Sequence, residues 1–103
     1  MNPIIIYATH PNLKTAKKII RALLSRRLIA CANLFPVHST YRWKNKIVNS
    51  KEIVSIIKTK SVNWSKVKSE ITKLHPYETP CIIKINAEAN KGFADWINEE
   101  VKK

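Results

Sequence analysis

The segment 75–81 places four kinds of reactive side chain close together between two prolines. It contains the imidazole of His75, the phenol of Tyr77, the carboxylate of Glu78 and the thiol of Cys81. Because proline restricts the backbone, such side chains lose little conformational entropy when they bind a ligand. The same residues also fit a structural role, with His75 ending a helix and Tyr77 filling the core. Their spacing leaves both interpretations open.

Metal binding is the chemistry that these residue types suggest first. The sequence contains five thiol and imidazole donors, which are Cys31, Cys81, His10, His38 and His75. No two of them have the spacing of a local ligand set, so a site would be assembled from distant parts of the chain or from several subunits. Thiolate and imidazole ligands favour copper or zinc over magnesium or calcium. Cys31 has an alanine on either side, where a cysteine also fits as a small core residue.

Catalytic signatures are missing from the sequence. Gly92 is the only glycine, which excludes a glycine-rich phosphate-binding loop. No serine lies in the glycine-flanked elbow that exposes a nucleophile. We therefore expect a protein that is not an enzyme.

Hydrophobic spacing predicts the elements that must position these side chains. An apolar run at residues 4–8 predicts a strand that gives way to a turn at Thr9. Apolar residues at helical spacing predict a helix from Leu13 to residue 24, capped by Asn12 or Thr9. A second helix begins near residues 61–63 and ends at His75, since the residue before Pro76 is pushed out of the helical region. A strand at 82–85 and a third helix at about 90–101 complete the chain.

The longest predicted element is a hairpin over residues 29–60. Its strands cover residues 29–43 and 47–60, and Asn45 lies in the turn between them because asparagine tolerates a positive φ. Pro36 predicts a bulge or a bend in the first strand, since proline cannot donate to a sheet ladder. The second strand points apolar residues to both faces, with Ile57 on one and Val54 on the other.

This element order is typical of an α+β, ferredoxin-like fold. The order βαββαβ with an extra C-terminal helix predicts a four-stranded antiparallel sheet with a long central hairpin and helices on one face. At 103 residues, we expect a single domain, 1–103. Two main helices cover only one sheet face, so the apolar residues of the other face need a further copy of the chain as cover. We therefore predict a closed homo-oligomer.

The charge is strongly basic and unevenly distributed. The net charge is +12, and residues 1–51 contain ten basic residues and no acid. Such asymmetry can indicate a polyanion partner, and the polar side of the first predicted helix carries Lys14, Lys17, Lys18 and Arg21. A Lys-rich composition without functional meaning is the competing explanation. The strand 53–60 lacks the aromatic residues on which RNA-binding modules of this fold stack bases, so nucleic acid is not an expected partner.

We expect a cytoplasmic protein with free thiols. No run of about 18 apolar residues is present, so no membrane contact is expected. The sequence begins without a basic leader, and its two cysteines lack C-x-x-C spacing.

Five short motifs together resemble the CutA family of divalent-ion tolerance proteins. They run in order along nearly the whole chain, at residues 30–34 (ACANL), 41–46 (YRWKNK), 57–59 (IKT), 75–80 (HPYETP) and 95–97 (DWI). Each motif is short, but the set at these separations is specific. Two positions depart from the family pattern: Ala8 stands where some bacterial members have a cysteine, and Asn45 stands where the hairpin tip usually has a glycine.

The resemblance implies a fold, an assembly and a ligand class. It implies a homotrimer of ferredoxin-like subunits with interlocking hairpins, related in architecture to PII signalling proteins. It also implies association with divalent metal ions, copper above all, for which Cys31 and His75 are the matching donors. A cleft between subunits, which would also suit a small anionic ligand, is expected to involve Trp43, Glu52, Lys58, Tyr77 and Glu78. The alternative function is a basic module that uses the first helix to bind a polyanion or nucleic acid.

Overall fold

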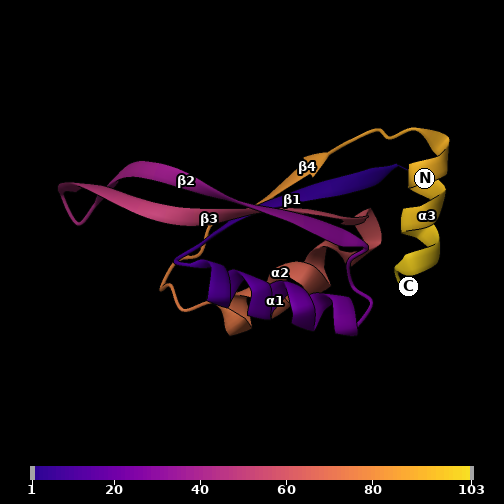
Figure 1. The fold of residues 1–103 in the computed structure, drawn as a ribbon, viewed down its shortest axis with the longest axis horizontal. Helices are drawn as coiled ribbons and strands as arrows, with labels where there is room; N and C mark the ends of the chain where they lie inside the picture. The colour runs from indigo at the N-terminus through magenta and orange to yellow at the C-terminus, as the bar shows by residue number, and fades with distance from the viewer. Residues whose placement is uncertain (1, 103) are drawn as a thin grey trace.

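The computed structural model describes residues 2–102 as one four-stranded antiparallel sheet with helices against it. The strand order is β2-β3-β1-β4, and Figure 1 shows α1 and α2 side by side under one face of the sheet. The predicted α+β, ferredoxin-like fold is therefore confirmed. The elements in chain order are β1 (Pro3–His10), α1 (Leu13–Ser25), β2 (Cys31–Trp43), β3 (Lys46–Lys60), the 3-10 turn η1 (Ser61–Asn63), α2 (Trp64–Leu74), β4 (Ile82–Asn86) and α3 (Lys91–Glu100).

The core lies between the sheet and the two helices. Alternate residues of a strand point to opposite faces, and Ile4 and Ile6 of β1 are buried on the helix side together with Ile57 of β3. They pack against the apolar stripes of α1 and α2, whose buried members are Ala16, Ile19, Ile20, Leu23, Val67 and Ile71. The helix α3 lies apart from this layer, where Ile97 and Val101 pack on Ala30.

The helix ends follow the sequence signals. The side chain of Asn12 accepts a hydrogen bond from the backbone N–H of Thr15 at 2.8 Å, so Asn12, one of the two predicted candidates, is the N-cap of α1. The helix α2 ends at His75, whose N–H donates to the carbonyl oxygen of Ile71 at 2.8 Å before Pro76 breaks the pattern. This end directs the chain into the segment 75–81.

The hairpin of β2 and β3 is long and regular. Trp43 pairs with Lys46, so the turn has only two residues, and Lys44 and Asn45 have φ angles of 50° and 65°. Positive φ at both positions is the geometry of a type I′ turn, in which asparagine is favoured. The predicted bulge at Pro36 is wrong, because Pro36 pairs with Ile53 in an unbroken register. The strand β2 lies at the sheet edge, where a proline is tolerated if its nitrogen faces away from the neighbouring strand.

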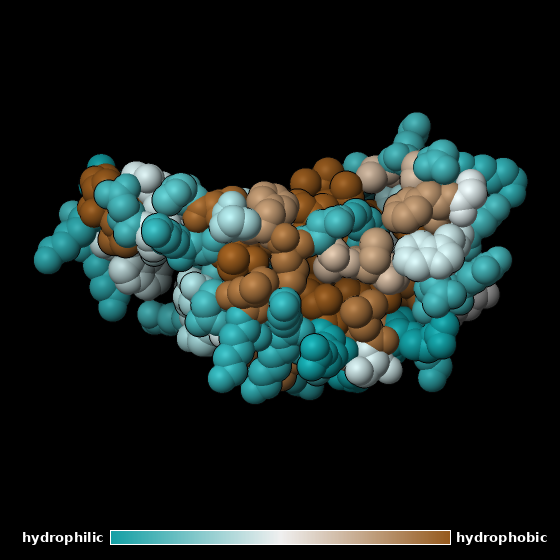
Figure 2. Space-filling view, in the orientation of Figure 1, coloured by the Kyte–Doolittle hydropathy of each residue, from teal (hydrophilic) through white to brown (hydrophobic). Residues whose placement is uncertain are grey.

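The sheet face that points away from α1 and α2, called the open face below, carries apolar side chains without a covering layer. Phe35, Ile83 and Ile85 are 41%, 50% and 47% exposed there, while Val54 is fully buried on the same face. Figure 2 shows apolar surface across the middle of the molecule and hydrophilic side chains along the lower edge, where α1 lies. The prediction that both faces of β3 are apolar is confirmed.

The helix layer carries the basic surface. Lys14, Lys17, Lys18 and Arg21 are exposed on α1, and within residues 2–102 none of them forms an ion pair. The ion pair of this layer joins Arg26 to Glu70 of α2 at 2.6 Å. No helix within the described part of the chain is long and apolar enough to cross a membrane.

Candidate functional site

The strand β1 runs two residues beyond its predicted end. Thr9 and His10 pair with Val54 and Ile53 of β3, so the expected turn begins only at Pro11. Because strand residues alternate between faces, Tyr7 and Thr9 lie on the open face and His10 points toward the helices. His10 is consequently fully buried.

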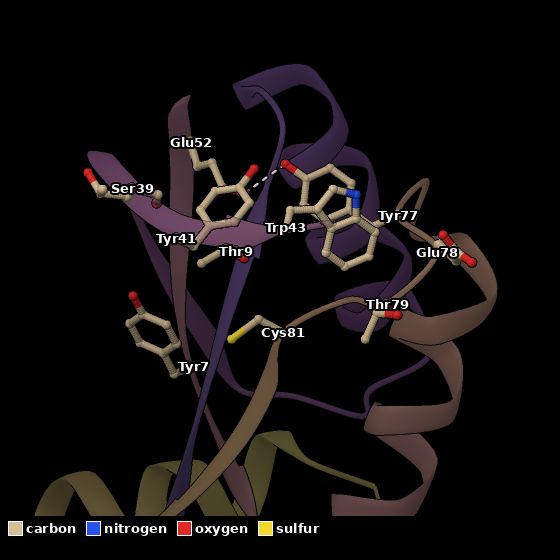
Figure 3. A pocket seen from close by; sticks show the side chains of 11 residues that line it. Tyr7, Thr9, Ser39, Tyr41, Trp43, Glu52, Tyr77, Glu78, Thr79 and Cys81 are labelled. Atoms are coloured by element: carbon tan, nitrogen blue, oxygen red, sulfur yellow. Dashed lines mark hydrogen bonds between the residues drawn. The ribbon is translucent and has the colours of Figure 1, made fainter. Parts of the chain in front are cut away.

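A pocket of about 560 Å³ lies on the open face, between the hairpin and the segment that follows α2. Tyr41, Trp43 and Glu52 reach it from β2 and β3, Tyr7 and Thr9 come from β1, and the segment 77–81 closes it (Figure 3). Its wall contains aromatic rings, carboxylates, hydroxyls and a thiol, and no Lys, Arg or His of residues 2–102. The lining residues are Tyr7, Thr9, Ser39, Thr40, Tyr41, Trp43, Glu52, Tyr77, Glu78, Thr79 and Cys81.

Glu52 is the buried carboxylate of this pocket. It is only 7% exposed, and its Oε2 accepts a hydrogen bond from the hydroxyl of Tyr77 at 2.7 Å (Figure 3). No Lys, Arg or His within residues 2–102 forms an ion pair with it. Burial and the bond to the Glu52 carboxylate raise the pKa of the Tyr77 hydroxyl, so Tyr77 remains a donor at neutral pH. A buried carboxylate without a cation is costly, so this position favours a positively charged ligand.

His75 holds the segment after α2 against β1. Its Nε2–H donates to the carbonyl oxygen of Thr9 at 2.7 Å, and its Nδ1 accepts the backbone N–H of Tyr77 at 3.1 Å. These partners require a neutral imidazole with the proton on Nε2. Both nitrogens are used inside the chain, so a metal ion at His75 would have to displace one of them.

His10 lies behind His75 in the core. The two rings are stacked with centroids 5.4 Å apart, and Nε2 of His10 lies 2.8 Å from the hydroxyl of Ser55. Its Nδ1 is buried without a hydrogen-bond partner among the described residues. Burial, reinforced by the neighbouring His75 and opposed by Glu52, lowers the pKa of His10 to about 4.

The two cysteines lie in different environments and are free. Burial raises the pKa of the Cys81 thiol, the Glu52 carboxylate raises it further, and a hydrogen bond with Thr9 acts in the opposite direction. Burial also raises the pKa of the Cys31 thiol, partly offset by Lys58. Both side chains are therefore thiols at neutral pH, and a metal ion would have to displace their protons.

Four of the seven predicted site residues line the pocket and three do not, although His75 contacts Tyr77 directly behind the wall. Trp43, Glu52, Tyr77 and Glu78 all line the pocket. Cys31 pairs with Lys58, whereas Thr9, the partner of His75, pairs with Val54. Lys58 and Val54 are separated by four residues along β3, which is roughly 13 Å.

Cys31 and His75 therefore do not meet within one chain. Lys58 hydrogen-bonds the side chain of Asn33 and does not line the pocket. Within residues 2–102, no group of three or more His, Cys, Asp or Glu side chains is arranged to hold a metal ion.

Sequence reasoning missed the contribution of β1 to the pocket. Tyr7 and Thr9 lie within the segment read as a buried strand and a turn, and no local motif marks them. Their alternate spacing was the available signal, since it places both on one face once the strand extends to His10.

Comparison with known proteins shows the family of this chain. Residues 4–100 match the family model described as CutA1 divalent ion tolerance protein. The chain belongs to this family. It is 43% identical to the divalent-cation tolerance protein CutA of Pyrococcus horikoshii, over 97% of this chain and 99% of that protein.

Solved structures of CutA proteins have the same fold. CutA1 from Pyrococcus horikoshii superimposes with a TM-score of 0.94 at 42% identity, covering 97% of this chain and 99% of that one. The CutA of Archaeoglobus fulgidus, described as a periplasmic divalent cation tolerance protein, gives a TM-score of 0.94 at 40% identity, with 97% and 99% covered. The CutA fold therefore extends over essentially the whole chain.

Proposed function

We propose that this protein is a non-enzymatic, homotrimeric CutA protein that binds a divalent cation, copper in preference to others, at the pocket on its open face. The observation that supports this most directly is the Glu52 carboxylate, which is 7% exposed and has the Tyr77 hydroxyl as donor, but forms no ion pair within residues 2–102. A bound cation supplies the missing charge. Glu78 and Cys81 add a second carboxylate and a soft donor to the same wall.

Cys31 and His75 are the donors that the family resemblance implies, and they enter this proposal through the assembly. A metal ion held by both needs Cys31 from one copy and His75 from another, because roughly 13 Å of β3 separates their positions in one chain. An anionic ligand at the same cleft would likewise need cations from a neighbouring copy, such as Lys58, since among the described residues no Lys, Arg or His lines the pocket.

The trimer is proposed from the exposed apolar surface. Side chains such as Ile83 and Ile85 on the open face are about half exposed, which is costly for a small domain that stays alone. The hairpin extends the molecule to 44 Å along its longest axis, so it can reach across a neighbouring copy (Figure 1). Interlocked hairpins of this kind are the architecture that we propose to share with PII signalling proteins.

The cytoplasm is the proposed location. Cys31 and Cys81 are both free thiols, which suits a reducing compartment.

Copper titration of the purified protein tests the metal proposal. The parent, the Glu52→Gln variant and the Cys31→Ser, His75→Ala double variant are titrated by calorimetry, with Glu99→Gln of α3 as the matched acid control. We expect the first two changes to weaken copper binding at least about tenfold and the control to leave it unchanged. Copper isotherms that are the same for all four proteins would show that the proposed donors are wrong.

A polyanion-binding role is the second candidate. It is favoured by the four exposed cations of α1, which form no ion pair within residues 2–102 and lie on the layer opposite the open face. That layer stays accessible when another copy covers the open face (Figure 1).

A further inference from the structure

The outward surface of α1 and α2, called the helix surface below, lies on the side of the sheet opposite the open face (Figure 1). Within residues 2–102 its exposed cations form no ion pair, and Glu70, the one acid of these two helices, is already paired with Arg26 at 2.6 Å. A second copy that covers the open face leaves this side free, so its charge persists in the proposed assembly. The exposed cations are Lys14, Lys17, Lys18, Arg21, Lys66, Lys68 and Lys73.

A Lys-rich composition does not by itself explain this surface. The helices α1 and α2 together contain seven Lys and Arg residues and one Glu, whereas α3 contains one Lys and three acids. The three helices belong to one chain with one compositional bias, so a bias without function would load them alike. The positive charge is instead concentrated on the helix surface.

The cations of α1 also lie where they destabilise the helix. Lys14 and Lys18 are four residues apart, as are Lys17 and Arg21, so each pair brings like charges together. Lys14 lies in the first turn, where a cation opposes the helix dipole and where α1 has no acid. A bound anion would relieve both effects. Binding of an anion therefore explains this placement better than stability does.

The uncharged residues of the helix surface fit phosphate groups better than nucleic acid bases. Hydroxyl and ammonium groups bind phosphate oxygens, whereas bases of single strands stack on exposed aromatic rings. Trp64 is the one aromatic residue of the two helices, and it packs against the core. Apart from the cations, the exposed residues of α1 and α2 are Leu13, Leu24, Ser25, Ser65, Ser69, Thr72 and Leu74.

The helix surface lacks the apolar area of a membrane-binding helix. Such a helix places its apolar face among the acyl chains of the lipid. The apolar face of α1 is buried in the core, as Ile19 and Leu23 show, and the three exposed leucines lie at the helix ends. The surface therefore offers charge and hydroxyl groups without an apolar face to insert.

We propose that the helix surface binds inorganic polyphosphate, a flexible chain of phosphate groups without bases. Each phosphate of the chain carries negative charge, and the cations of two neighbouring helices give the chain contacts along and across α1 and α2. The inference rests on the second candidate function, which is polyanion binding, and it adds the class of polyanion. No covalent step is involved.

The test compares polyphosphate with a single-stranded DNA oligonucleotide that has the same number of phosphate groups. Both are titrated into the full-length parent protein by calorimetry at about 50 mM salt. We expect polyphosphate to bind at least about tenfold more tightly, because its charges lie closer together and the helix surface offers no ring for the bases. Equal affinities, or tighter binding of the oligonucleotide, would overturn the inference.

Matched variants locate the polyphosphate site. Lys14→Gln, Lys18→Gln on α1 and Lys44→Gln, Lys46→Gln at the hairpin tip remove the same charge from exposed positions. We expect the α1 variant to weaken polyphosphate binding about tenfold or more and the hairpin variant to weaken it less than about twofold. Equal losses of polyphosphate affinity would show that only net charge matters and would contradict the inference.

The melting temperature without polyphosphate distinguishes lost contacts from a damaged fold. The Lys14→Gln, Lys18→Gln variant should melt at a higher temperature than the parent, because a like-charge pair is removed from α1. A damaged fold would instead lower the melting temperature together with the affinity. The Lys66→Gln, Lys73→Gln variant on α2 is an independent check, and unchanged polyphosphate affinity in that variant would contradict a site formed by both helices.

The remaining outcomes separate this inference from the function on which it rests. If the oligonucleotide binds as tightly as polyphosphate, the polyphosphate inference is lost and the polyanion role stands. If neither ligand binds at about 50 mM salt, both are lost. Phosphatidylglycerol vesicles are titrated in parallel, and binding of vesicles without binding of polyphosphate would make the helix surface a lipid contact and overturn the inference.

Discussion

The hydroxyl of Tyr77 donates to Oε2 of Glu52 at 2.7 Å, and this bond joins the segment after α2 to the middle of β3. The backbone N–H of Tyr77 also donates to His75, which in turn donates to Thr9 of β1. The wall of the pocket is therefore held in place by hydrogen bonds to two strands, one to the Glu52 side chain of β3 and one to the Thr9 backbone carbonyl oxygen of β1. Its geometry depends on the sheet and not on the segment alone.

Tyr77→Phe should lower the free energy of unfolding by about 1–3 kcal/mol, because it leaves a buried carboxylate without its donor. The matched control is Tyr41→Phe, whose hydroxyl lies 3.5 Å from Ser50 at an exposed position and whose loss should cost under about 0.5 kcal/mol. Urea unfolding at equal protein concentrations measures both changes. If Tyr77→Phe and Tyr41→Phe lower the free energy of unfolding equally, the hydrogen bond from Tyr77 to Glu52 adds no stability of its own.

The protein should lose stability as the pH falls from about 6.5 toward 4. Burial and the neighbouring His75 lower the pKa of His10 from 6.5 to about 4. Between these two pH values His10 is therefore protonated in the unfolded chain and neutral in the folded one. The contribution of His10 to the free energy of unfolding is fully present above its unfolded pKa, and roughly 3 kcal/mol of it is lost as the pH falls through its folded pKa. Urea unfolding across this range is expected to show a smaller loss for His10→Phe than for the parent. A change at the exposed His38, as in His38→Phe, should leave the pH dependence as it is.

Ile83→Asp should disrupt the proposed trimer. The side chain is 50% exposed on the open face of a single chain, and a carboxylate placed there would be buried without a partner if another copy covers it. Sedimentation at micromolar concentration should give a trimeric mass for the parent and a smaller mass for the variant. Val62→Asp is the control, since Val62 is 59% exposed in η1 and outside that face. A monomeric parent would contradict the trimer itself.

Charge reversal on α1 should show whether a polyanion binds to this helix or is attracted only by the net charge of the protein. If about six phosphates are neutralised, binding of a DNA duplex should fall roughly a thousandfold between 50 and 200 mM salt. The Lys17→Glu, Lys18→Glu variant should bind more weakly than Lys44→Glu, Lys46→Glu at the hairpin tip, although both change the charge equally. Equal losses of DNA affinity in the two double variants would indicate that only the net charge of the protein matters. No DNA binding by the parent at 50 mM salt would exclude the second candidate function.

Most of the fold could be predicted because its signals are local. The N-cap at Asn12, the helix end before Pro76 and the positive φ at Asn45 each depend on residues within one turn of the chain. Two local expectations were wrong for reasons that involve other strands. The strand β1 continues to His10 because β3 pairs with it, and Pro36 needs no bulge because β2 is an edge strand.

The candidate site was predictable only in part. The motifs that contain Trp43, Tyr77 and Glu78 marked residues that do line the pocket, together with Glu52. Their mutual geometry was not predictable, because it follows from the pairing of β1 with β3 and of β2 with β3. Cys31 and His75 illustrate the opposite case, since the family resemblance suggested them as donors to one site and strand register separates them within the chain.

The sequence by itself determined the element order, the family resemblance and the presence of apolar residues on both faces of the central hairpin. These properties depend on composition, spacing and short-range geometry, which the chain carries without folding. Only the tertiary structure decided that His10 is buried behind His75, that Glu52 has a hydroxyl partner but no ion pair within residues 2–102, and that four aromatic rings share one pocket. Such contacts join residues far apart in the sequence, and strand register, which is a long-range property, selects which of them meet.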